Sequence, residues 1–265
     1  MTAFGSFDKV SVDINDYVAV VEFSNPPQNF FDVALISQIA EAFEALDETS
    51  DCRAIVLASP GKIFCAGANL NDGRDLGEKS PGRYPLYEQG VRLFRTNKPI
   101  VGAIQGAAIG GGFGLAMVPD FRIACPQSRF SANFTRMGYH PGFGLTVTAP
   151  ETIGEKHAAL MLYSGRRVKG EEAHAMGLAD VFVSTPDEVR PAAVELATEI
   201  AQYSPLGVVA CRKIMRRSVN FDRRHQIIDI HRDVVVVAEF RHEFTFFRLI
   251  LNHAPERILS PFTRQ

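Results

Sequence analysis

The chain reads K-P-I-V-G-A-I-Q-G-A-A-I-G-G-G-F-G-L from Lys98 to Leu115, and this stretch decides the fold. Residues 100–104 form an apolar run of strand length, and the glycines at 110–112 lead into a helical pattern. A strand that feeds a glycine run at a helix start exposes backbone N–H groups, which can hold a negative oxygen. Consecutive glycines cost folding entropy, so we expect something to approach this backbone closely.

The composition indicates a chain that can bury a large core. It has 265 residues, of which 46% are apolar, and a formal net charge of −2. Charges of both signs are spread along the chain, which argues against a nucleic-acid partner or a polybasic membrane surface. No apolar run reaches the ~20 residues of a membrane span, and no signal-peptide pattern is visible. The 4 cysteines have no metal-type spacing, which predicts no metal site and a reduced, cytoplasmic protein.

Strand and helix patterns alternate up to about residue 203. The expected strands are 10–14, 17–23, 53–58, 100–104, 121–124, 129–131 and 180–183, and the expected helices are 32–47, 84–96, 150–163, 170–176 and 188–202. This alternation predicts an α/β core over residues 1–203. Residues 204–265 show helical patterns only (205–217, 221–241 and 243–253), rich in apolar side chains, and are predicted to form an oligomerisation region.

A second loop of small residues follows the strand expected at 53–58. It reads G-K-I-F-C-A-G-A-N-L from Gly61 to Leu70. Ligands bind at the carboxyl ends of strands in α/β proteins. Two such loops can place two N–H groups around one oxygen, which is the architecture of an oxyanion hole.

Seven motifs, in order, make the chain similar to the crotonase (enoyl-CoA hydratase/isomerase) superfamily. They are N-P-P-Q-N at 25–29, K-I-F-C-A-G-A-N-L at 62–70, K-P-I-V-G-A-I-Q-G-A-A-I-G-G-G at 98–112, D-F-R-I-A at 120–124, P-G-F-G at 141–144, S-G-R-R-V-K-G-E-E-A at 164–173 and G-L-A-D-V at 177–181. The resemblance covers nearly the whole chain. It implies a fold of repeated ββα units with a C-terminal helical trimerisation region, assembled as a homotrimer or homohexamer. It also implies an acyl-CoA thioester substrate, with coenzyme A as part of the substrate and no separate cofactor.

The resemblance also assigns the site. The N–H groups of Ala66 and Gly111 would form the oxyanion hole for a thioester enolate, each about 2.7–3.1 Å from its oxygen. The substrate path would be lined by Lys62, Ala68, Asn69, Leu70, Gly110, Gly114, Phe134 and Met137. Asn69 stands where the family more often has an aspartate.

The sequence departs from the hydratase pattern at two positions. Hydratases of this family carry two glutamates that hold a water and transfer protons, and here those positions are Gly114 and Phe134. Neither residue can exchange protons, so ordinary hydration should be weak. The proton partner is expected first at His140 and Tyr139, and second in the segment 70–88. A family member that decarboxylates a malonyl-type CoA ester has a tyrosine matching Tyr139.

Three functions therefore stay open. The first is an enoyl-CoA hydratase/isomerase-like lyase, the second a decarboxylase or C–C hydrolase of a malonyl- or β-keto-acyl-CoA, and the third a catalytically silent CoA-binding homologue. A nicotinamide enzyme is disfavoured because the glycines lack G-x-G-x-x-G spacing. In the simplest alternative, the glycine run only packs a helix on a strand, and Tyr139 and His140 are ordinary wall residues. Cys65 has no base paired to it in the sequence, which argues against a nucleophile.

Overall fold

The computed structural model describes residues 7–68 and 85–216 of the chain. The helices predicted at 221–241 and 243–253, and the predicted substrate-path residues Asn69 and Leu70, lie outside these ranges. The elements are β1 (Val10–Asn15), β2 (Val18–Phe23), α1 (Val33–Asp47), β3 (Ala54–Ala58), β4 (Ile63–Cys65), α2 (Pro85–Leu93), β5 (Ile100–Ile104), β6 (Ala107–Ile109), α3 (Gly111–Ala116), β7 (Phe121–Ala124), β8 (Arg129–Ser131), the 3₁₀ turn η2 (Thr135–Met137), α4 (Leu145–Ser164), β9 (Val168–Lys169), α5 (Gly170–Ala175), β10 (Val181–Phe182), α6 (Pro186–Ala201) and α7 (Pro205–Met215).

The strands form two sheets that the chain visits in turn. The larger sheet has the order β1-β2-β3-β5-β7-β10, and the smaller has the order β4-β6-β8-β9. Strands β3, β5 and β7 belong to the larger sheet, and the strand after each of them (β4, β6 and β8) belongs to the smaller one. A helix follows each pair: α2 after β4, α3 after β6 and α4 after β8. This repetition is the ββα spiral that the family resemblance implies.

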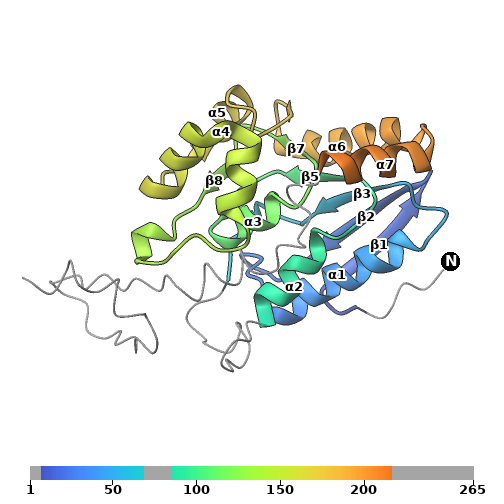
Figure 1. Ribbon diagram of the computed structural model, residues 1–265, viewed down its shortest axis with the longest axis horizontal. Coiled ribbons are helices and arrows are strands. Elements are labelled where there is room, and N and C mark those ends of the chain that lie inside the picture. Colours follow the sequence, from blue (N-terminus) through green and yellow to red (C-terminus); the bar gives the residue numbers. More distant parts are fainter. Residues whose placement is uncertain (1–6, 69–84, 217–265) are drawn as a thin grey trace, which may run out of the picture.

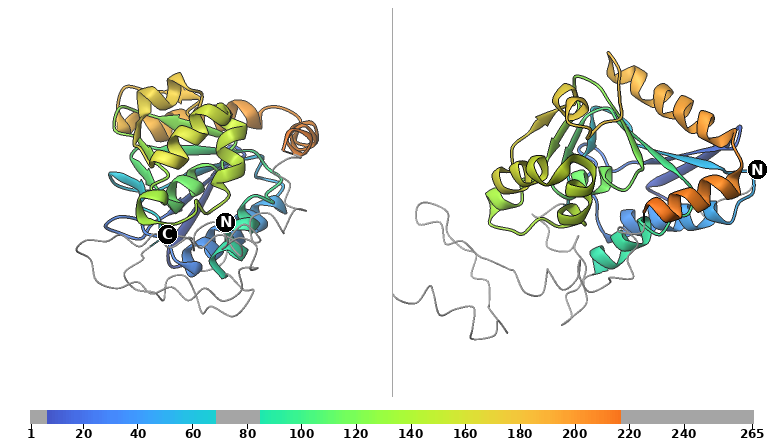
Figure 2. Two further views of the ribbon diagram at one scale, coloured as in Figure 1. Left: turned by 60° about the vertical axis from the view of Figure 1, so that its left-hand side comes forward. Right: turned by 45° about the horizontal axis from the view of Figure 1, so that its top comes forward.

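The central strands β3 and β5 of the larger sheet are buried on both faces, which explains their all-apolar sequences. In β3, the side chains of Ile55 and Leu57 join the main core, which also contains α1 and α3 residues. The alternate side chains, including Val56, pack with Ala193 and Ala197 of α6 in a second cluster. Helices α1 and α6 therefore lie on opposite sides of this sheet (Figure 1). Helices α4 and α5 gather together at one end of the molecule (Figure 2).

Elements with a strong local pattern match their predictions. The hairpin of β1 and β2 is antiparallel and pairs Val10 with Phe23. Helix α1 begins after Asp32, whose Oδ1 accepts a hydrogen bond from the Leu35 N–H at 2.7 Å, as an N-cap does. The strand expected at 100–104 is β5, with the predicted bounds.

Three short strands and one helix start differ from the sequence prediction. The loop predicted from Ser59 to Ala68 contains β4, and the sequence also gave no prediction for β6 or β9. Two or three residues are too few for an alternation pattern to show. Proline favours the first turn of a helix, which puts the predicted start at Pro150. In the structure α4 already begins at Leu145, and it is kinked at Gly154, whose φ is 74°.

Candidate active site

Two neighbouring parallel strands bring the two predicted loops together. Strand β4 pairs with β6 through Ile63 and Ala107. The chain leaves the carboxyl ends of these strands toward Gly67 and Gly111, respectively. A Cβ atom built on Gly67 would lie 3.4 Å from the Gly111 nitrogen. The loops are therefore side by side at a sheet edge where α/β proteins bind ligands.

Each glycine of the run at 110–112 is met by a different neighbour. Gly110 has a φ of 57°, and a Cβ there would lie 3.0 Å from the Asn133 Oδ1. A Cβ on Gly111 would overlap the ring of Phe31, and one on Gly112 would overlap the Cys65 carbonyl group. Protein atoms therefore approach this backbone closely, as the packing alternative for the glycine run also predicts. Tight packing thus accounts for the glycine side chains, but it does not account for their N–H groups.

The N–H of Gly111 is open to an incoming oxygen. The carbonyl of Gly110 accepts the N–H groups of Phe113 and Gly114 at 3.0 and 3.2 Å, so the first turn of α3 uses those two donors. Within the described residues, no acceptor takes the N–H of Gly111, and this residue is partly exposed. A helix start leaves such donors unpaired, and they attract negative charge.

The N–H predicted as the second donor is already in use. The Ala66 N–H donates to the carbonyl oxygen of Gln28 at 3.1 Å, which speaks against its role in an oxyanion hole. Ala68 forms a parallel bridge with Phe31, whose own N–H donates to the Gly67 carbonyl at 2.9 Å. In a parallel bridge of this register, the Ala68 N–H faces away from Phe31. No acceptor for that N–H occurs in the described ranges, so Ala68 fits the second donor better than Ala66.

The N-P-P-Q-N segment at 25–29 holds this loop in place, a role that the sequence did not reveal. Asn29 is buried with a φ of 50°, and its Nδ2 donates to the Ile63 carbonyl at 2.8 Å. Its Oδ1 accepts the Asn25 N–H at 3.0 Å. Asparagine tolerates the left-handed conformation, and the position of Asn29 two residues after the second of two prolines was the available signal for a structural turn.

The two positions at which family hydratases carry glutamates, here Gly114 and Phe134, have different surroundings. Gly114 is buried in α3, and a Cβ there would overlap the Cβ of Phe143 and lie 2.9 Å from its Cγ. Phe134 is half-buried, and its Cζ lies 4.0 Å from a Cβ built on Gly110. The structure therefore brings Phe134 beside the oxyanion turn, while position 114 has no room for any side chain.

The two proton-transfer candidates follow Phe134 along the chain. Tyr139 is 41% exposed, and its N–H donates to the Phe134 carbonyl at 2.9 Å. His140 is half-buried, and burial lowers the pKa of its imidazole below the ordinary 6.5. The neutral form of His140 is therefore favoured at neutral pH.

Two further residues predicted to line the substrate path, Lys62 and Met137, are exposed. Lys62 is exposed, and its carbonyl group leaves no room for a side chain at Gly106. Met137 is 43% exposed, with its sulfur 3.9 Å from the Asn133 Nδ2. The segment 70–88, the second source expected for a proton partner, is described only from residue 85 onward.

Cys65 lies next to the loop but cannot supply a thiolate. It is fully buried, and desolvation raises the pKa of its thiol to about 12. A thiol with that pKa stays protonated at neutral pH and is a poor nucleophile. The prediction that Cys65 is not a nucleophile is supported.

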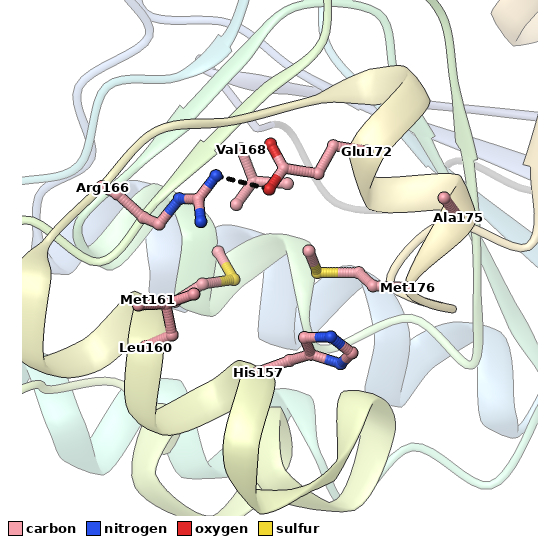
Figure 3. Close-up of a pocket in the computed structure, with 8 residues that line it drawn as sticks. All are labelled: His157, Leu160, Met161, Arg166, Val168, Glu172, Ala175 and Met176. Atoms are coloured by element: carbon pink, nitrogen blue, oxygen red, sulfur yellow. Dashed lines mark hydrogen bonds and ion pairs between the residues drawn. The ribbon is translucent and has the colours of Figure 1, made fainter.

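Two cavities lie away from these loops. One of about 300 Å³ lies between α4 and α5 and contains the Arg166–Glu172 ion pair, whose Nη2 and Oε1 are 2.5 Å apart (Figure 3). Another, of about 690 Å³, lies between α7 and the start of β7. Neither is lined by a predicted site residue, so the backbone donors are the stronger guide to the active site.

In the described ranges, no group of three or more His, Cys, Asp or Glu side chains could hold a metal ion, and no helix could cross a membrane.

Comparison with known proteins gives one consistent result. The family profile described as enoyl-CoA hydratase/isomerase matches residues 13–244. A probable enoyl-CoA hydratase of Mycobacterium tuberculosis, EchA14, is 31% identical over 81% of this chain and 84% of its own length. A probable enoyl-CoA hydratase of Bacillus subtilis is 30% identical over 74% of this chain and 77% of its own. The structure of Pseudomonas aeruginosa DspI superposes with a TM-score of 0.74 at 28% identity, over 87% of this chain and 98% of that one.

Proposed function

The chain belongs to the enoyl-CoA hydratase/isomerase family of the crotonase superfamily, and on this premise we propose that it acts on an acyl-CoA thioester through an enolate. The main observation that supports this proposal is the open N–H of Gly111 beside the Gly67–Ala68 backbone. The loops that carry Gly111 and Ala68 follow adjacent parallel strands, which supports the proposal that their two N–H groups stabilise one oxyanion.

The proposed chemistry begins at the thioester carbonyl. Its oxygen accepts hydrogen bonds from the N–H groups of Gly111 and Ala68, and both bonds strengthen as negative charge moves onto that oxygen. Because these donors belong to a rigid backbone, they need no reorganisation during the reaction. Removing one donor of this kind typically raises the barrier by about 2.7–4 kcal/mol.

Ordinary hydration of an enoyl-CoA should be slow. The family positions for the two glutamates hold Gly114 and Phe134, and Phe143 closes the space at position 114. A general acid or base must reach its proton within hydrogen-bond distance. We therefore assign proton transfer to His140, with Tyr139 as its neighbour. Hydration of crotonyl-CoA at the fast rate usual for family hydratases would contradict this assignment.

A second candidate function follows from the same absence of carboxylates. In decarboxylation of a malonyl-type CoA ester, the bond between the α carbon and the carboxylate breaks. The electron pair passes into the enolate, carbon dioxide leaves, and the α carbon then takes one proton. This reaction needs an oxyanion hole and a single proton donor, which the Gly111 N–H and the protonated fraction of His140 would supply.

A pair of variants at one position tests the oxyanion assignment. Gly111→Ala adds a Cβ against Phe31 and keeps the N–H, whereas Gly111→Pro adds a Cβ and removes the N–H. Proline is tolerated at the first helical position. Turnover should fall by about 10²–10³-fold more in the proline variant than in the alanine variant.

The substrate for this test comes from a panel of enoyl-, malonyl- and β-keto-acyl-CoA esters, with products identified by mass spectrometry. Equal turnover of the two variants, both folded by circular dichroism, would refute the Gly111 donor. Binding of the esters without any conversion would instead favour the catalytically silent homologue.

We also propose that the protein assembles as a homotrimer or homohexamer through residues 204–265. The described part of this region is residues 204–216, which contain α7, and no apolar residue of α7 is buried. Its Leu206, Ile214 and Met215 side chains are 83%, 57% and 78% exposed. Large apolar side chains that are exposed to this degree are more typical of an interface than of a solvated surface. Light scattering on the full chain should give three or six times the mass of 29.2 kDa.

A further inference from the structure

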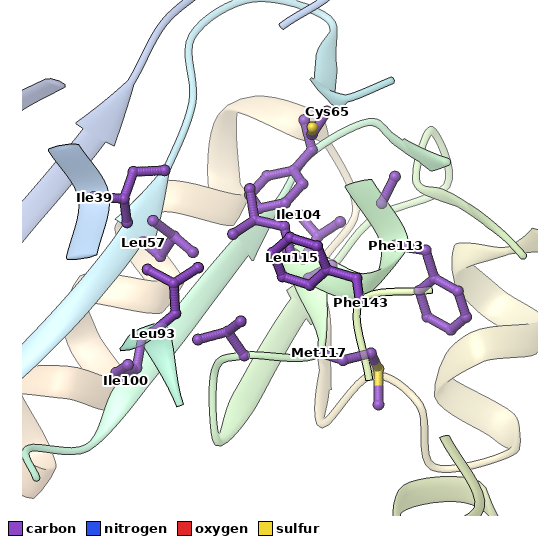
Figure 4. Packing of buried hydrophobic residues seen from close by; sticks show 14 of the residues in the cluster. Ile39, Leu57, Cys65, Leu93, Ile100, Ile104, Phe113, Leu115, Met117 and Phe143 are labelled. Atoms are coloured by element: carbon purple, nitrogen blue, oxygen red, sulfur yellow. The ribbon is translucent and has the colours of Figure 1, made fainter. Parts of the chain in front are cut away.

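Phe143 has an uncommon backbone conformation. Its φ is 56°, in the left-handed region that non-glycine residues rarely occupy. It lies between Gly142 and Gly144, and only 4% of the residue is exposed. Figure 4 shows its ring among the buried side chains of the main core, which include Leu115. A residue held in this region while buried points to a specific role for its side chain.

The ring of Phe143 lies against positions that lack side chains. A Cβ on Gly114 would overlap the Phe143 Cβ, and a Cβ on Gly90 in α2 would lie 3.3 Å from its Cε2. The ring centroid is 5.5 Å from that of Phe31, with the two planes tilted by 46°. The side chain of Phe143 thus packs against α2, α3 and Phe31.

Phe31 connects this ring to the proposed oxyanion donor. The end of its ring occupies the place that a Cβ on Gly111 would take. Gly111 and Gly114 are three positions apart in α3 and share one face of the helix. The two phenylalanines therefore pack against the side of α3 to which side chains at positions 111 and 114 would point, and they leave the Gly111 N–H without an acceptor among the described residues. Phe143 thus meets α3 at Gly114, about one helical turn from the Gly111 donor.

We propose that Phe143 determines the acyl specificity of this site: its ring replaces a side chain at position 114 and restricts the site to compact acyl groups whose reaction needs no carboxylate from α3. The inference rests on the proposed function for the identity of the ligand. The exclusion of a side chain at position 114 rests on the packing alone. The two parts can be tested separately.

The packing part is tested by a double-mutant cycle between positions 114 and 143. Gly114→Ala should lower the urea midpoint of the wild-type protein, because the new Cβ overlaps Phe143. In a Phe143→Gly background the same change should cost little, since the overlapping Cβ is gone and glycine accepts a φ of 56°. Phe143→Ala is the matched control, because it keeps that Cβ and should relieve the overlap only in part. Equal costs of Gly114→Ala in all three backgrounds would overturn the packing claim.

The specificity part is tested with acyl-CoA esters of increasing bulk, from acetyl-CoA to branched and aromatic esters, by calorimetric binding. Phe143→Gly should shift the affinity ratio of bulky to short esters by at least about tenfold relative to wild type. Phe43→Ala, which removes a buried ring from α1, is the control for lost stability and should leave this ratio unchanged.

The outcomes separate the two proposals. If the wild-type protein binds CoA esters but Phe143→Gly leaves their affinity ratio unchanged, the specificity inference is wrong and the proposed function survives. If the wild-type protein binds no CoA ester, the proposed function is wrong, and the acyl specificity assigned to Phe143 is refuted with it. The double-mutant cycle then reports on the packing of Phe143 alone.

Discussion

The backbone N–H of Ala66 donates a hydrogen bond to the carbonyl oxygen of Gln28 at 3.1 Å. This bond joins the loop after β4 to the N-P-P-Q-N segment. It also removes Ala66 from the set of donors open to a substrate. Ala68 has no such acceptor in the described part of the chain, so two neighbouring alanines should differ in function.

Replacing single peptide N–H groups by ester oxygens should separate these two alanines. An ester at Ala68 removes the proposed oxyanion donor without adding a ring, and kcat/KM should fall by about 10²–10³-fold. An ester at Ala66 removes one structural hydrogen bond, so it should lower the free energy of unfolding by about 1 kcal/mol and leave kcat unchanged. Steady-state kinetics and urea unfolding of both proteins check this. The opposite pattern would restore Ala66 as the donor.

The stability of the protein should depend on His140 below neutral pH. Burial lowers the pKa of this histidine from 6.5, so the unfolded chain takes up the proton more readily than the folded one. The contribution of neutral His140 is therefore fully present above pH 6.5 and is lost as the pH falls below that value. His140→Gln should flatten the fall in unfolding free energy between about pH 7 and 5. The exposed His157→Gln serves as control, and an unchanged slope in His140→Gln would contradict the prediction.

The cysteines should react with iodoacetamide in a definite order. Burial raises the pKa of Cys52 to about 11 and that of Cys65 to about 12, and Cys125 is buried as well. Cys211 is exposed on α7. At pH 8 the native protein should be labelled first at Cys211, and the other thiols should react after denaturation. Peptide mapping gives the order, with Cys211→Ser as control, and rapid native labelling of Cys65 would show that this loop opens.

Replacing Asp120, which lies outside the proposed site, should strongly lower the stability of the protein. Its Oδ2 accepts the Ile100 N–H and the Arg212 Nε–H, both at 2.8 Å, and its Oδ1 accepts from Arg216 at 3.1 Å. The Arg212 side chain is only 8% exposed, so Asp120→Ala leaves a buried charge uncompensated. The free energy of unfolding should fall by about 3–5 kcal/mol in urea titrations.

The matched control for Asp120 is the exposed Arg166–Glu172 pair. Its two side chains are 40% and 38% exposed, so solvent screens their attraction. Glu172→Ala should cost at most about 1 kcal/mol. Similar losses for the two variants would mean that Asp120 does not neutralise a buried charge.

Sequence patterns were sufficient wherever the cause of a structure is local. The Asp32 cap, the β1–β2 hairpin and the apolar run of β5 depend on neighbours a few residues away. The family resemblance, the close approach at the glycine run and the absence of carboxylates at Gly114 and Phe134 could likewise be read from the chain. Short strands escaped prediction because two or three residues carry no periodicity.

The choice of donors and the shape of the site depend on contacts between distant parts of the chain. Whether an N–H is open depends on which carbonyl group folds against it, and Gln28 reaches Ala66 from a separate segment. Likewise, the letter G at position 114 shows only that a glutamate is missing, whereas the fold shows that Phe143 occupies its space. A sequence shows which groups are present, but hydrogen bonds and excluded volume arise only when segments meet, and these determine which groups remain available for chemistry.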